Sequence, residues 1–369
     1  MKCPYYARCG SCRYSLTNYA YSLQDKLQRL REYISPFVLG TVHEAINKYY
    51  YRHKIIYHFA QEKGQLLAGF HPRGQRHVLP IEYCYLQKEE SNVLLHDCLA
   101  ILRSLHFQAY DPRNRQGSLR HLLLRYAQDG KVLLCFVGAT KDLRGSQNLV
   151  KALRLQHPEI IGIDYVYNPR DTSVVIEGKV RHLYGSGILW DRLGNYRFAI
   201  SSSSFYQVNP PMAEIIYTNT IQRMQLAKND VVADLYCGNG TISLFLAPYV
   251  KEVVGIEINP DAVANARQAS KDNRIKNVHF LCQDATQLLQ HEKFNALLVD
   301  PPRSGLSQKT IYSLCRNGPA KIAYISCNPI TLLRDLRQLQ RAYHVGKIHV
   351  FDQFAFTEHL EASVILERI

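Results

Sequence analysis

The sequence predicts an α/β protein whose second half forms a doubly wound, mostly parallel sheet. Three observations support this prediction. Short apolar runs typical of buried strands alternate with segments of helical periodicity after residue 230. A glycine-rich turn follows the first of these strands. Polar residues follow the ends of several strands, and ligands bind at the carboxyl ends of the strands in open sheets of this kind.

The first strands of this sheet surround the glycine-rich turn. Residues 231–236 have a strand pattern, residues 237–240 form the turn, and residues 241–246 can begin a helix. Residues 252–256 form a second strand, which ends at Glu257. A strand, a glycine-rich turn, a helix, a second strand and an acidic residue, in that order, are typical of a mononucleotide-binding half-fold.

The turn Gly238–Gly240 indicates the class of ligand. A dinucleotide needs its pyrophosphate at a helix N-terminus, usually with a fuller set of glycines. The shorter turn, with Asp234 before it, suits a ligand without phosphates, such as S-adenosylmethionine. Glu257 lies 19 positions after the first glycine of the turn and is placed to accept hydrogen bonds from both ribose hydroxyls. Asp284 follows the third strand and is placed to contact the adenine end of the ligand.

The alternation of strands and helices continues to the end of the chain. The remaining predicted elements are a helix at 260–273, strands at 278–282, 297–299 and 321–325, an amphipathic helix at 334–343, and closing strands at 347–354 and 361–369. Strands that alternate with helices are joined by crossovers, which place them parallel to one another.

A candidate nucleophile follows one of these strands. Cys327 comes directly after the strand at 321–325 and one serine, and an Asn-Pro turn follows it. A cysteine at this edge of an α/β sheet is exposed to a bound ligand. The alternative is a buried, unreactive thiol, because the reactivity of a cysteine depends on its surroundings.

The charge of the 369-residue chain is uneven. Residues 1–200 carry 28 Lys and Arg against 16 Asp and Glu, whereas residues 201–369 carry 17 against 15. This difference favours a polyanion-binding module joined to a near-neutral catalytic module, with simple solubility as the alternative. Arginine and tyrosines interleave at Tyr49–Arg52, which suits phosphate contacts and base stacking. A solvated face with core tyrosines would give the same pattern.

The sequence gives no sign of export or of a membrane span. It has no run of 18 apolar residues, and its first residues lack the apolar stretch of a signal peptide. We therefore expect a cytoplasmic protein, where thiols stay reduced. The ten cysteines are then expected to be metal ligands, catalysts or core residues rather than disulfides.

Four cysteines form a candidate metal site. Cys3, Cys9 and Cys12 lie within ten residues, and Cys84 is the predicted fourth ligand. Four thiolates can hold zinc or a [4Fe–4S] cluster, and the residues alone leave this choice open. The other cysteines lack such spacing and are predicted to be buried or inert thiols: Cys98, Cys135, Cys237, Cys282 and Cys315.

Five motifs in a fixed order carry a family resemblance. They are Phe205–Pro210, Asp234–Thr241, Asp300–Gly305, Ser326–Pro329 and Thr357–Glu361. Together they resemble the RNA uracil-C5 methyltransferases, which modify ribosomal or transfer RNA, and the resemblance covers nearly the whole chain. It implies a Rossmann-like methyltransferase domain and an RNA substrate.

The resemblance also implies roles for individual residues. Cys327 is the implied nucleophile and Glu361 the implied base. The implied S-adenosylmethionine-binding residues are Gln207, Tyr236, Glu257 and Asp300. Asp300 has a structural alternative, as a cap of its own turn. Many members of the family carry a [4Fe–4S] cluster on cysteines with this N-terminal spacing, which favours iron–sulfur over zinc.

Two features of the motifs separate competing interpretations. Asp-Pro-Pro also resembles the catalytic loop of adenine-N6 methyltransferases, but those enzymes place an aromatic residue next, and Arg303 stands there in this chain. Residues 353–357 differ from the Met-Phe-Pro-Gln-Thr of many relatives, although the His-x-Glu core is intact. Glu358 is a rival base, but we expect it to face the opposite side of a strand from Glu361.

The resemblance also predicts the organisation of the chain. We expect a cluster segment at 1–21 with its fourth ligand at Cys84, and a helical segment at 22–53 that packs on the catalytic domain. A β-rich α+β RNA-binding domain is expected at 54–200, and the methyltransferase domain at 201–369. A cluster without a preceding oligonucleotide-binding barrel resembles the short enzymes for 23S ribosomal RNA. The alternatives are a transfer-RNA uracil-54 enzyme and a non-catalytic RNA-binding protein. We expect a monomer.

Overall fold

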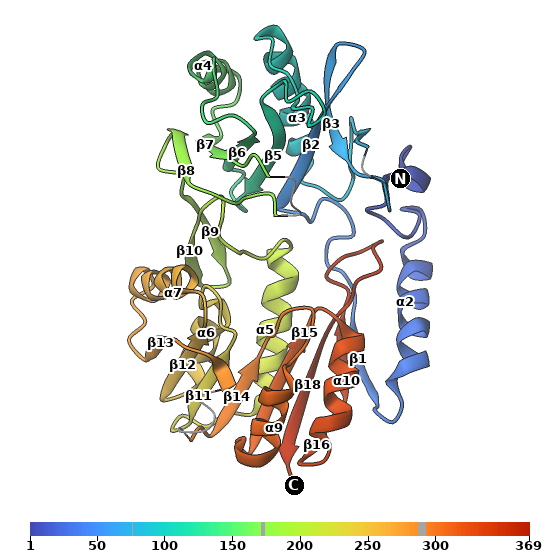
Figure 1. Cartoon of the computed structure of the whole chain (residues 1–369). Helices are drawn as coiled ribbons and strands as arrows, with labels where there is room; N and C mark the ends of the chain where they lie inside the picture. Colours follow the sequence, from blue (N-terminus) through green and yellow to red (C-terminus); the bar gives the residue numbers. More distant parts are fainter. Residues whose placement is uncertain (76, 171–173, 287–292) are drawn as a thin grey trace. The chain divides into compact units, whose positions relative to one another are not determined.

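The computed structural model describes residues 1–75, 77–170, 174–286 and 293–369 (Figure 1). The chain forms two compact units, and each unit is assembled from separate stretches of sequence. The first unit comprises Met1–Asn18, Asn47–Arg192 and Ala199–Val208, and the second comprises Tyr19–Ile46, Leu193–Phe198 and Asn209–Ile369. Part of the N-terminal segment therefore belongs to the same unit as the C-terminal half.

Parallel strands form the centre of the sheet in the second unit. They are β11 (Val231–Leu235), β12 (Glu252–Glu257), β13 (Val278–Cys282), β14 (Ala296–Val299) and β15 (Lys321–Ser326). Their order across the sheet is β15-β14-β11-β12-β13, and each neighbouring pair is parallel. The order reverses at β11, as it does in a doubly wound sheet, so the predicted fold class is confirmed.

The other side of this sheet contains antiparallel strands and one strand from the N-terminal half. The strands are β1 (Leu39–His43), β16 (Tyr343–Val345), β17 (Ile348–Phe351) and β18 (Glu361–Arg368). β18 is antiparallel to β15, β16 and β17, and β1 pairs in parallel with β17. The sequence analysis did not predict β1 in this sheet, because its partner is about 300 residues away in the chain.

Helices connect these strands. The elements are α2 (Tyr19–Ile34), α5 (Pro210–Met224), α6 (Thr241–Leu246), the 3-10 turn η1 (Ala247–Tyr249), α7 (Pro260–Asp272), α9 (Gln308–Asn317) and α10 (Pro329–Leu339). α10 begins five residues before the predicted start at 334. Asn328 caps it by accepting a hydrogen bond from the backbone N–H of Ile330, and proline suits the first turn.

The core of the second unit explains why residues near the N-terminus belong to it. Leu23, Leu30 and Ile34 on one face of α2 are buried with apolar residues of the central strands and of α10. These residues recur at helical spacing and form an apolar stripe along the helix. Each fully buried Leu or Ile side chain contributes about 1.5–3 kcal/mol, so the stripe fixes α2 on this unit.

The first unit is built on a mainly antiparallel sheet. Its strands are β2 (Lys54–Glu62), β3 (Gln65–Phe70), β4 (Leu79–Pro80), β5 (Leu119–Tyr126), β6 (Val132–Gly138), β7 (Ile160–Tyr167) and β8 (Val180–Tyr184), in the order β4-β3-β2-β5-β6-β7-β8. The helices are α1 (Tyr6–Cys9), α3 (Glu90–Ser104) and α4 (Ser146–Gln156). β9 (Leu189–Leu193) and β10 (Tyr196–Ile200) form a separate pair. In the part of the chain that the structure describes, no helix could span a membrane.

Candidate functional site

Five predicted residues meet at one edge of the sheet in the second unit. Asp234 is the last residue but one of β11, and Glu257 is the last residue of β12. Asp300 and Cys327 directly follow β14 and β15. The carboxyl ends of parallel strands share one edge. Glu361 begins β18, which is antiparallel to β15, so its position at the amino end of that strand places it at the same edge. We call this group the carboxyl edge.

Burial and neighbouring charges perturb the pKa of both Cys327 and Glu361 at this edge. Cys327 is half-buried, and burial raises the pKa of its thiol to about 11, with further contributions from Glu361 and Asp300. Glu361 is 8% exposed, and burial raises its pKa well above the usual value, as does the nearby Asp300. The Arg303 guanidinium acts in the opposite direction on the pKa of both groups. A thiol, a carboxyl and one cation are therefore within electrostatic reach of each other.

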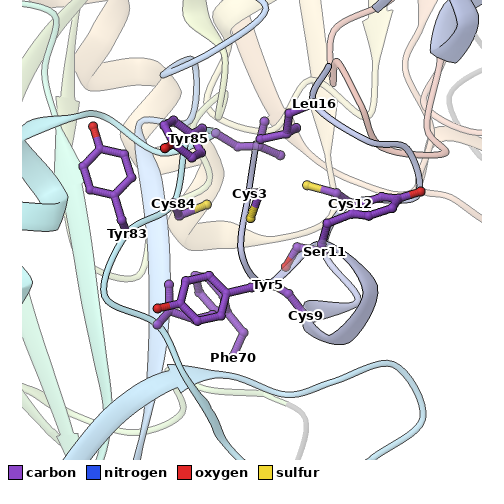
Figure 2. Close-up of a pocket in the computed structure, with 13 residues that line it drawn as sticks. Cys3, Tyr5, Cys9, Ser11, Cys12, Leu16, Phe70, Tyr83, Cys84 and Tyr85 are labelled. Carbon is purple, nitrogen blue, oxygen red and sulfur yellow. The ribbon is translucent and has the colours of Figure 1, made fainter. Parts of the chain in front are cut away.

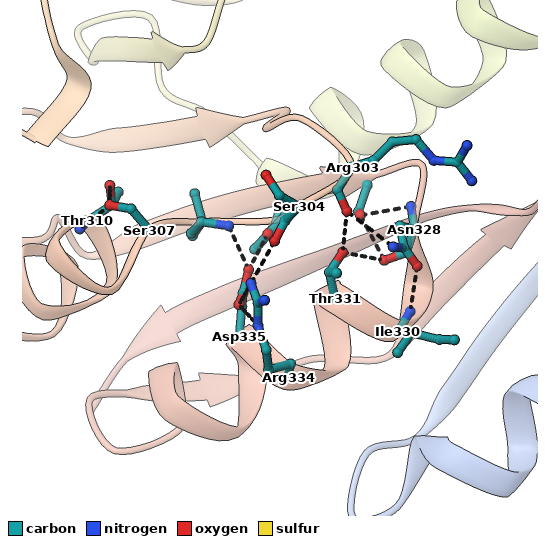
Figure 3. Close-up of polar contacts among 12 residues, drawn as sticks. Arg303, Ser304, Ser307, Thr310, Asn328, Ile330, Thr331, Arg334 and Asp335 are labelled. Atoms are coloured by element: carbon teal, nitrogen blue, oxygen red, sulfur yellow. Dashed lines mark hydrogen bonds and ion pairs between the residues drawn. The ribbon is translucent and has the colours of Figure 1, made fainter. Parts of the chain in front are cut away.

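Hydrogen bonds hold the turn that carries Cys327 against the loop that carries Arg303 (Figure 3). The backbone carbonyl of Arg303 accepts from Asn328 Nδ2 at 3.1 Å and from Thr331 Oγ1 at 3.2 Å. Ser326 Oγ accepts from the Asn328 N–H at 3.1 Å. These bonds explain the Asn-Pro turn beside the cysteine: the asparagine caps α10 and connects the two loops.

A second set of contacts, which the sequence analysis missed, fixes the far end of the same loop. Asp335 is fully buried and accepts from the Leu306 N–H at 2.8 Å and from the Tyr324 hydroxyl at 2.7 Å. Arg334 pairs with Asp335 at 2.7 Å and donates to the Ser304 carbonyl at 2.8 Å (Figure 3). The sequence does contain a signal: Asp335 interrupts the apolar stripe of α10.

The glycine-rich turn and Glu257 form an open, polar cradle. Glu257 accepts from the Gly238 N–H at 3.2 Å and from the Asn259 N–H at 2.9 Å. Gly238 has a φ of +52°, and a side chain there would meet no atom within 4 Å, so the space above the turn is free for a ligand. Tyr236 has a φ of +65°, which is unusual for a residue other than glycine and typical of binding sites.

The carboxylates around this cradle differ in their surroundings. Asp234 is fully buried and accepts from Ser243 Oγ at 2.6 Å. Burial raises its pKa to about 7; the hydrogen bond from Ser243 opposes this, and Asp300 and Glu257 add to it. Burial also raises the pKa of Asp300 to about 7. Asp284 is exposed and accepts from the Thr286 N–H at 2.7 Å. The carboxylates and the open space at the turn suit an adenosine-type ligand with a positive charge.

Gln207 belongs to the first unit, unlike the other predicted cofactor residues. It lies in Ala199–Val208, and Arg125 holds this segment by donating to the backbone carbonyls of Ser202 and Ser204. Arg125 is 3% exposed, so a buried guanidinium fixes the backbone just before Gln207. Arg125 lies in the basic half of the chain, which the charge balance predicts to bind a polyanion. Its burial makes it a structural residue instead.

The two glutamates of the closing motif differ in burial. We expected Glu358 and Glu361 on opposite faces of one strand, and this was wrong, because β18 begins only at Glu361. Glu358 precedes the strand and is exposed, whereas Glu361 is buried beside Asp300. Burial therefore distinguishes Glu361 from Glu358 as the candidate base, whereas the expected positions on opposite faces of a strand do not.

The four cysteines of the predicted metal site, Cys3, Cys9, Cys12 and Cys84, line one pocket of the first unit (Figure 2). We call it the cysteine pocket. Cys3, Cys12 and Cys84 direct their sulfur atoms toward a common space. Burial raises the pKa of Cys12 to about 12, with contributions from Cys84, Cys9 and Cys3. Among the described residues, no three Cys, His, Asp or Glu side chains have the arrangement of a metal-binding group. The pocket therefore has the right donors, but not the arrangement of a bound metal.

Arg52 is a half-buried cation whose charge is coupled to two cysteines of this pocket. Burial opposes the charge of Arg52, but Tyr51, Cys84 and Cys12 nevertheless raise its pKa. Its buried Nε has no hydrogen-bond partner among the residues that the structure describes. The sequence analysis assigned Arg52 to RNA contact, because it lies among tyrosines. A positive group coupled to Cys84 and Cys12 suits an anionic metal–thiolate cluster.

The remaining cysteines differ in exposure. Cys98, Cys135 and Cys237 are buried, as predicted. Cys282 is exposed and Cys315 is half-buried, so the prediction that these two thiols are inert cannot rest on burial.

Comparison with known proteins gives one consistent family. A family model described as tRNA (uracil-5-)-methyltransferase matches residues 18–291 and 284–369. An uncharacterized RNA methyltransferase of Bacillus cereus is 32% identical over all of this chain and 83% of that protein. An uncharacterized RNA methyltransferase of Halalkalibacterium halodurans is 31% identical over 99% of this chain and 82% of that protein.

A solved structure shares the fold. It is the Pyrococcus abyssi tRNA (uracil-54, C5)-methyltransferase in complex with S-adenosyl-L-homocysteine, with a TM-score of 0.80 and 23% identity. The match covers 95% of this chain and 83% of that chain.

Proposed function

The chain belongs to the tRNA (uracil-5-)-methyltransferase family of S-adenosylmethionine-dependent RNA methyltransferases, and on that premise we propose that it methylates C5 of a uridine in 23S ribosomal RNA. The observation that carries the proposed chemistry is the position of Cys327 and Glu361 at the carboxyl edge, where they directly flank the paired residues Ser326 and Ala362 of β15 and β18. One thiol and one carboxyl are the two groups that uracil-C5 methylation needs. The basic first 200 residues support an RNA substrate.

The proposed reaction begins with Cys327. Its thiolate adds to C6 of uracil, which breaks the C5–C6 double bond and makes C5 a nucleophilic, enolate-like carbon. S-adenosylmethionine, when bound, supplies the methyl group as an electrophile. Glu361 then removes the proton from the methylated C5. The electrons of that C–H bond restore the C5–C6 double bond and expel the Cys327 thiolate.

The electrostatics of the free site bear on both steps. A Cys327 pKa of about 11 leaves little thiolate near neutral pH, so the site needs positive charge to activate the thiol. Arg303 supplies part of it. The raised pKa of Glu361 makes it a stronger proton acceptor once it is ionised, which suits removal of a carbon-bound proton.

S-adenosylmethionine is proposed to bind at the glycine-rich turn. The carboxylate of Glu257 would hold the ribose, and the open space above Gly238 would admit the backbone contacts. The remaining proposed contacts come from Tyr236, Asp284 and Asp300 of the same unit. Asp234 has its hydrogen bond to Ser243, so its contribution is to hold the turn.

The cysteine pocket is proposed to hold a [4Fe–4S] cluster on Cys3, Cys9, Cys12 and Cys84. Four thiols in one apolar and aromatic pocket, with the Arg52 cation beside them, support this assignment. Methyl transfer changes no oxidation state, so the cluster would organise the RNA-binding unit. Iron and acid-labile sulfide in equal amounts are expected after anaerobic purification. Zinc in their place would show that the assignment is wrong.

A transfer-RNA uracil-54 specificity is the second candidate. The description of the matching family and the fold of the Pyrococcus abyssi enzyme favour it. Mapping of 5-methyluridine in ribosomal and transfer RNA, with and without this protein, distinguishes the two. We expect one position in 23S ribosomal RNA to lose its methyl group. Loss at position 54 of transfer RNA instead would favour the second candidate, and no loss in either RNA would favour a non-catalytic RNA-binding protein.

A further inference from the structure

A lysine ammonium is buried inside the second unit. Lys26 lies in α2, and its side chain is 1% exposed. Its Nζ donates to Asp352 Oδ1 at 2.7 Å, to the Phe354 carbonyl at 3.0 Å and to the His359 carbonyl at 3.2 Å. An ammonium has three protons to donate, so these contacts use all of its donors.

These three acceptors lie in the connection that leads to Glu361. Residues 352–360 join β17 to β18, and Phe351 and Glu361 are paired across the two strands. Asp352 is the first residue of the connection, and His359 is the last but one. A single ammonium therefore holds both ends and the middle of the segment that precedes the proposed base.

Two further contacts in the connection have a shorter reach than those of Lys26. Asn209 Nδ2 donates to the Gln353 carbonyl at 2.7 Å, and Thr357 Oγ1 donates to the Phe354 carbonyl at 2.8 Å. The first contact fixes one end of the connection, and the second is local. Of the contacts named here, those of Lys26 are the ones that reach from one end to the other.

The ion pair between Lys26 and Asp352 is explained better by the geometry that it imposes on the connection than by a gain in stability. Burial lowers the pKa of Lys26, and the Asp352 carboxylate opposes that change. Apolar residues often replace a buried ion pair without loss of stability, whereas removal of one partner is destabilising because it leaves an unpaired buried charge. The directional contacts of an ammonium to two carbonyls cannot be reproduced by apolar packing.

We propose that Lys26 is a positioning residue for Glu361: it fixes the 352–360 connection so that the Glu361 carboxyl faces the uracil held by Cys327. This inference rests on the proposed function. Cys327 lies on a different loop, held by contacts to the Arg303 carbonyl. One side-chain contact, between Arg303 Nη2 and His359 Nδ1 at 3.2 Å, joins the Arg303 loop to the connection, and Lys26 does not take part in it. Loss of Lys26 therefore affects removal of the C5 proton more than the earlier methyl transfer.

The test compares release of product with formation of the methylated covalent complex. K26M keeps an unbranched side chain and removes the charge. With RNA substrate and methyl-labelled S-adenosylmethionine, K26M should accumulate a labelled protein–RNA complex and release product about 10- to 100-fold more slowly. R29Q is the matched control, because Arg29 lies on the same helix in an exposed pair with Asp25 at 4.0 Å. It should release product at the normal rate.

Folding is measured separately, by melting temperature and S-adenosylmethionine binding. A folded K26M that releases product at the normal rate would overturn the proposal. If K26M does not fold, K26M/D352N removes the unpaired carboxylate, and the folded double variant should still accumulate the complex. Normal release by that variant, or its failure to fold, would also overturn the proposal.

A further control separates this inference from the proposed function. Wild-type protein is incubated with S-adenosylmethionine and RNA that carries 5-fluorouridine, from which no C5 proton can be removed. Absence of a covalent complex would contradict the Cys327 mechanism itself, and the proposal for Lys26 would fail with it. A wild-type complex together with normal release by K26M would contradict only the role of Lys26.

Discussion

The carboxyl edge of the second unit and the cysteine pocket of the first unit position their reactive groups by different means. At the carboxyl edge, parallel strands place the residues, and hydrogen bonds from α10 fix the loops around Cys327. In the cysteine pocket, three of the four cysteines lie on or beside the four-residue helix α1. The sheet therefore positions the residues of one site by itself, whereas we propose that the other site takes its arrangement from a bound cluster.

The largest expected effect is at the carboxyl edge. Cys327→Ala should lower methylation by at least about 1,000-fold, because no other group would form the bond to C6. Binding of S-adenosylmethionine, measured by calorimetry, should remain, since the glycine-rich turn is unchanged. Cys315→Ala is the matched control and should retain turnover. Measurable turnover by the Cys327 variant would contradict the covalent mechanism.

Replacement of the base should give the next largest effect. Glu361→Gln should slow release of product by about 100-fold or more while methyl transfer continues, because amide nitrogen does not accept the C5 proton. A labelled covalent complex, resolved on a denaturing gel, should accumulate. Glu358→Gln changes the exposed glutamate and should release product normally. The opposite pattern would make Glu358 the base.

The next prediction concerns Asp300 at the carboxyl edge and the pH dependence of the free energy of unfolding. Its pKa is raised to about 7, so in the folded protein it stays protonated while the unfolded chain ionises from about pH 4 upward. The stability that it contributes is fully present below the unfolded pKa and is lost as pH rises through the folded pKa.

Asp300→Asn does not titrate and should therefore be more stable than wild type at about pH 8. A gain of roughly 1–3 kcal/mol is expected, after an allowance for the partial exposure of Asp300, and little gain is expected at about pH 4. Chemical denaturation at the two pH values measures the difference. Equal gains at both values would show that ionisation of Asp300 is not the cause.

The smallest expected effect concerns the cysteine pocket. Arg52→Met should weaken retention of the cluster by about 10-fold, because the variant loses the cation that faces Cys12 and Cys84. Loss of the visible absorbance during incubation with a chelator measures it. Arg52→Lys keeps the charge and should lose the cluster more slowly than the methionine variant. Equal rates for the two variants would limit the role of Arg52 to packing.

Local patterns made the carboxyl edge predictable. Strand–turn–helix order and the position of Cys327 after a strand are properties of short segments. The start of α10 at Pro329 could also be predicted from the Asn-Pro pair. Motifs that resemble one family supplied Glu361, which periodicity alone does not mark.

Contacts between distant segments could not be predicted in the same way. β1 pairs with β17, and Lys26 reaches Asp352 across 326 residues. Lys26 is one of several charged residues in an amphipathic helix, and nothing in the local pattern separates it from Arg29, which is exposed. Arg125 could not be separated from the other basic residues of the first 200 in the same way, because burial of a charged residue depends on the tertiary fold.

The most direct test of the proposed chemistry is the identity of the residue that bonds to RNA. RNA that carries 5-fluorouridine at the target position is incubated with the protein and S-adenosylmethionine, and the complex is digested and analysed by mass spectrometry. The account predicts a stable adduct of methylated fluorouridine on Cys327, and none with Cys327→Ala. An adduct on another residue, or methylation of ordinary RNA without any adduct on its fluorinated counterpart, would contradict it.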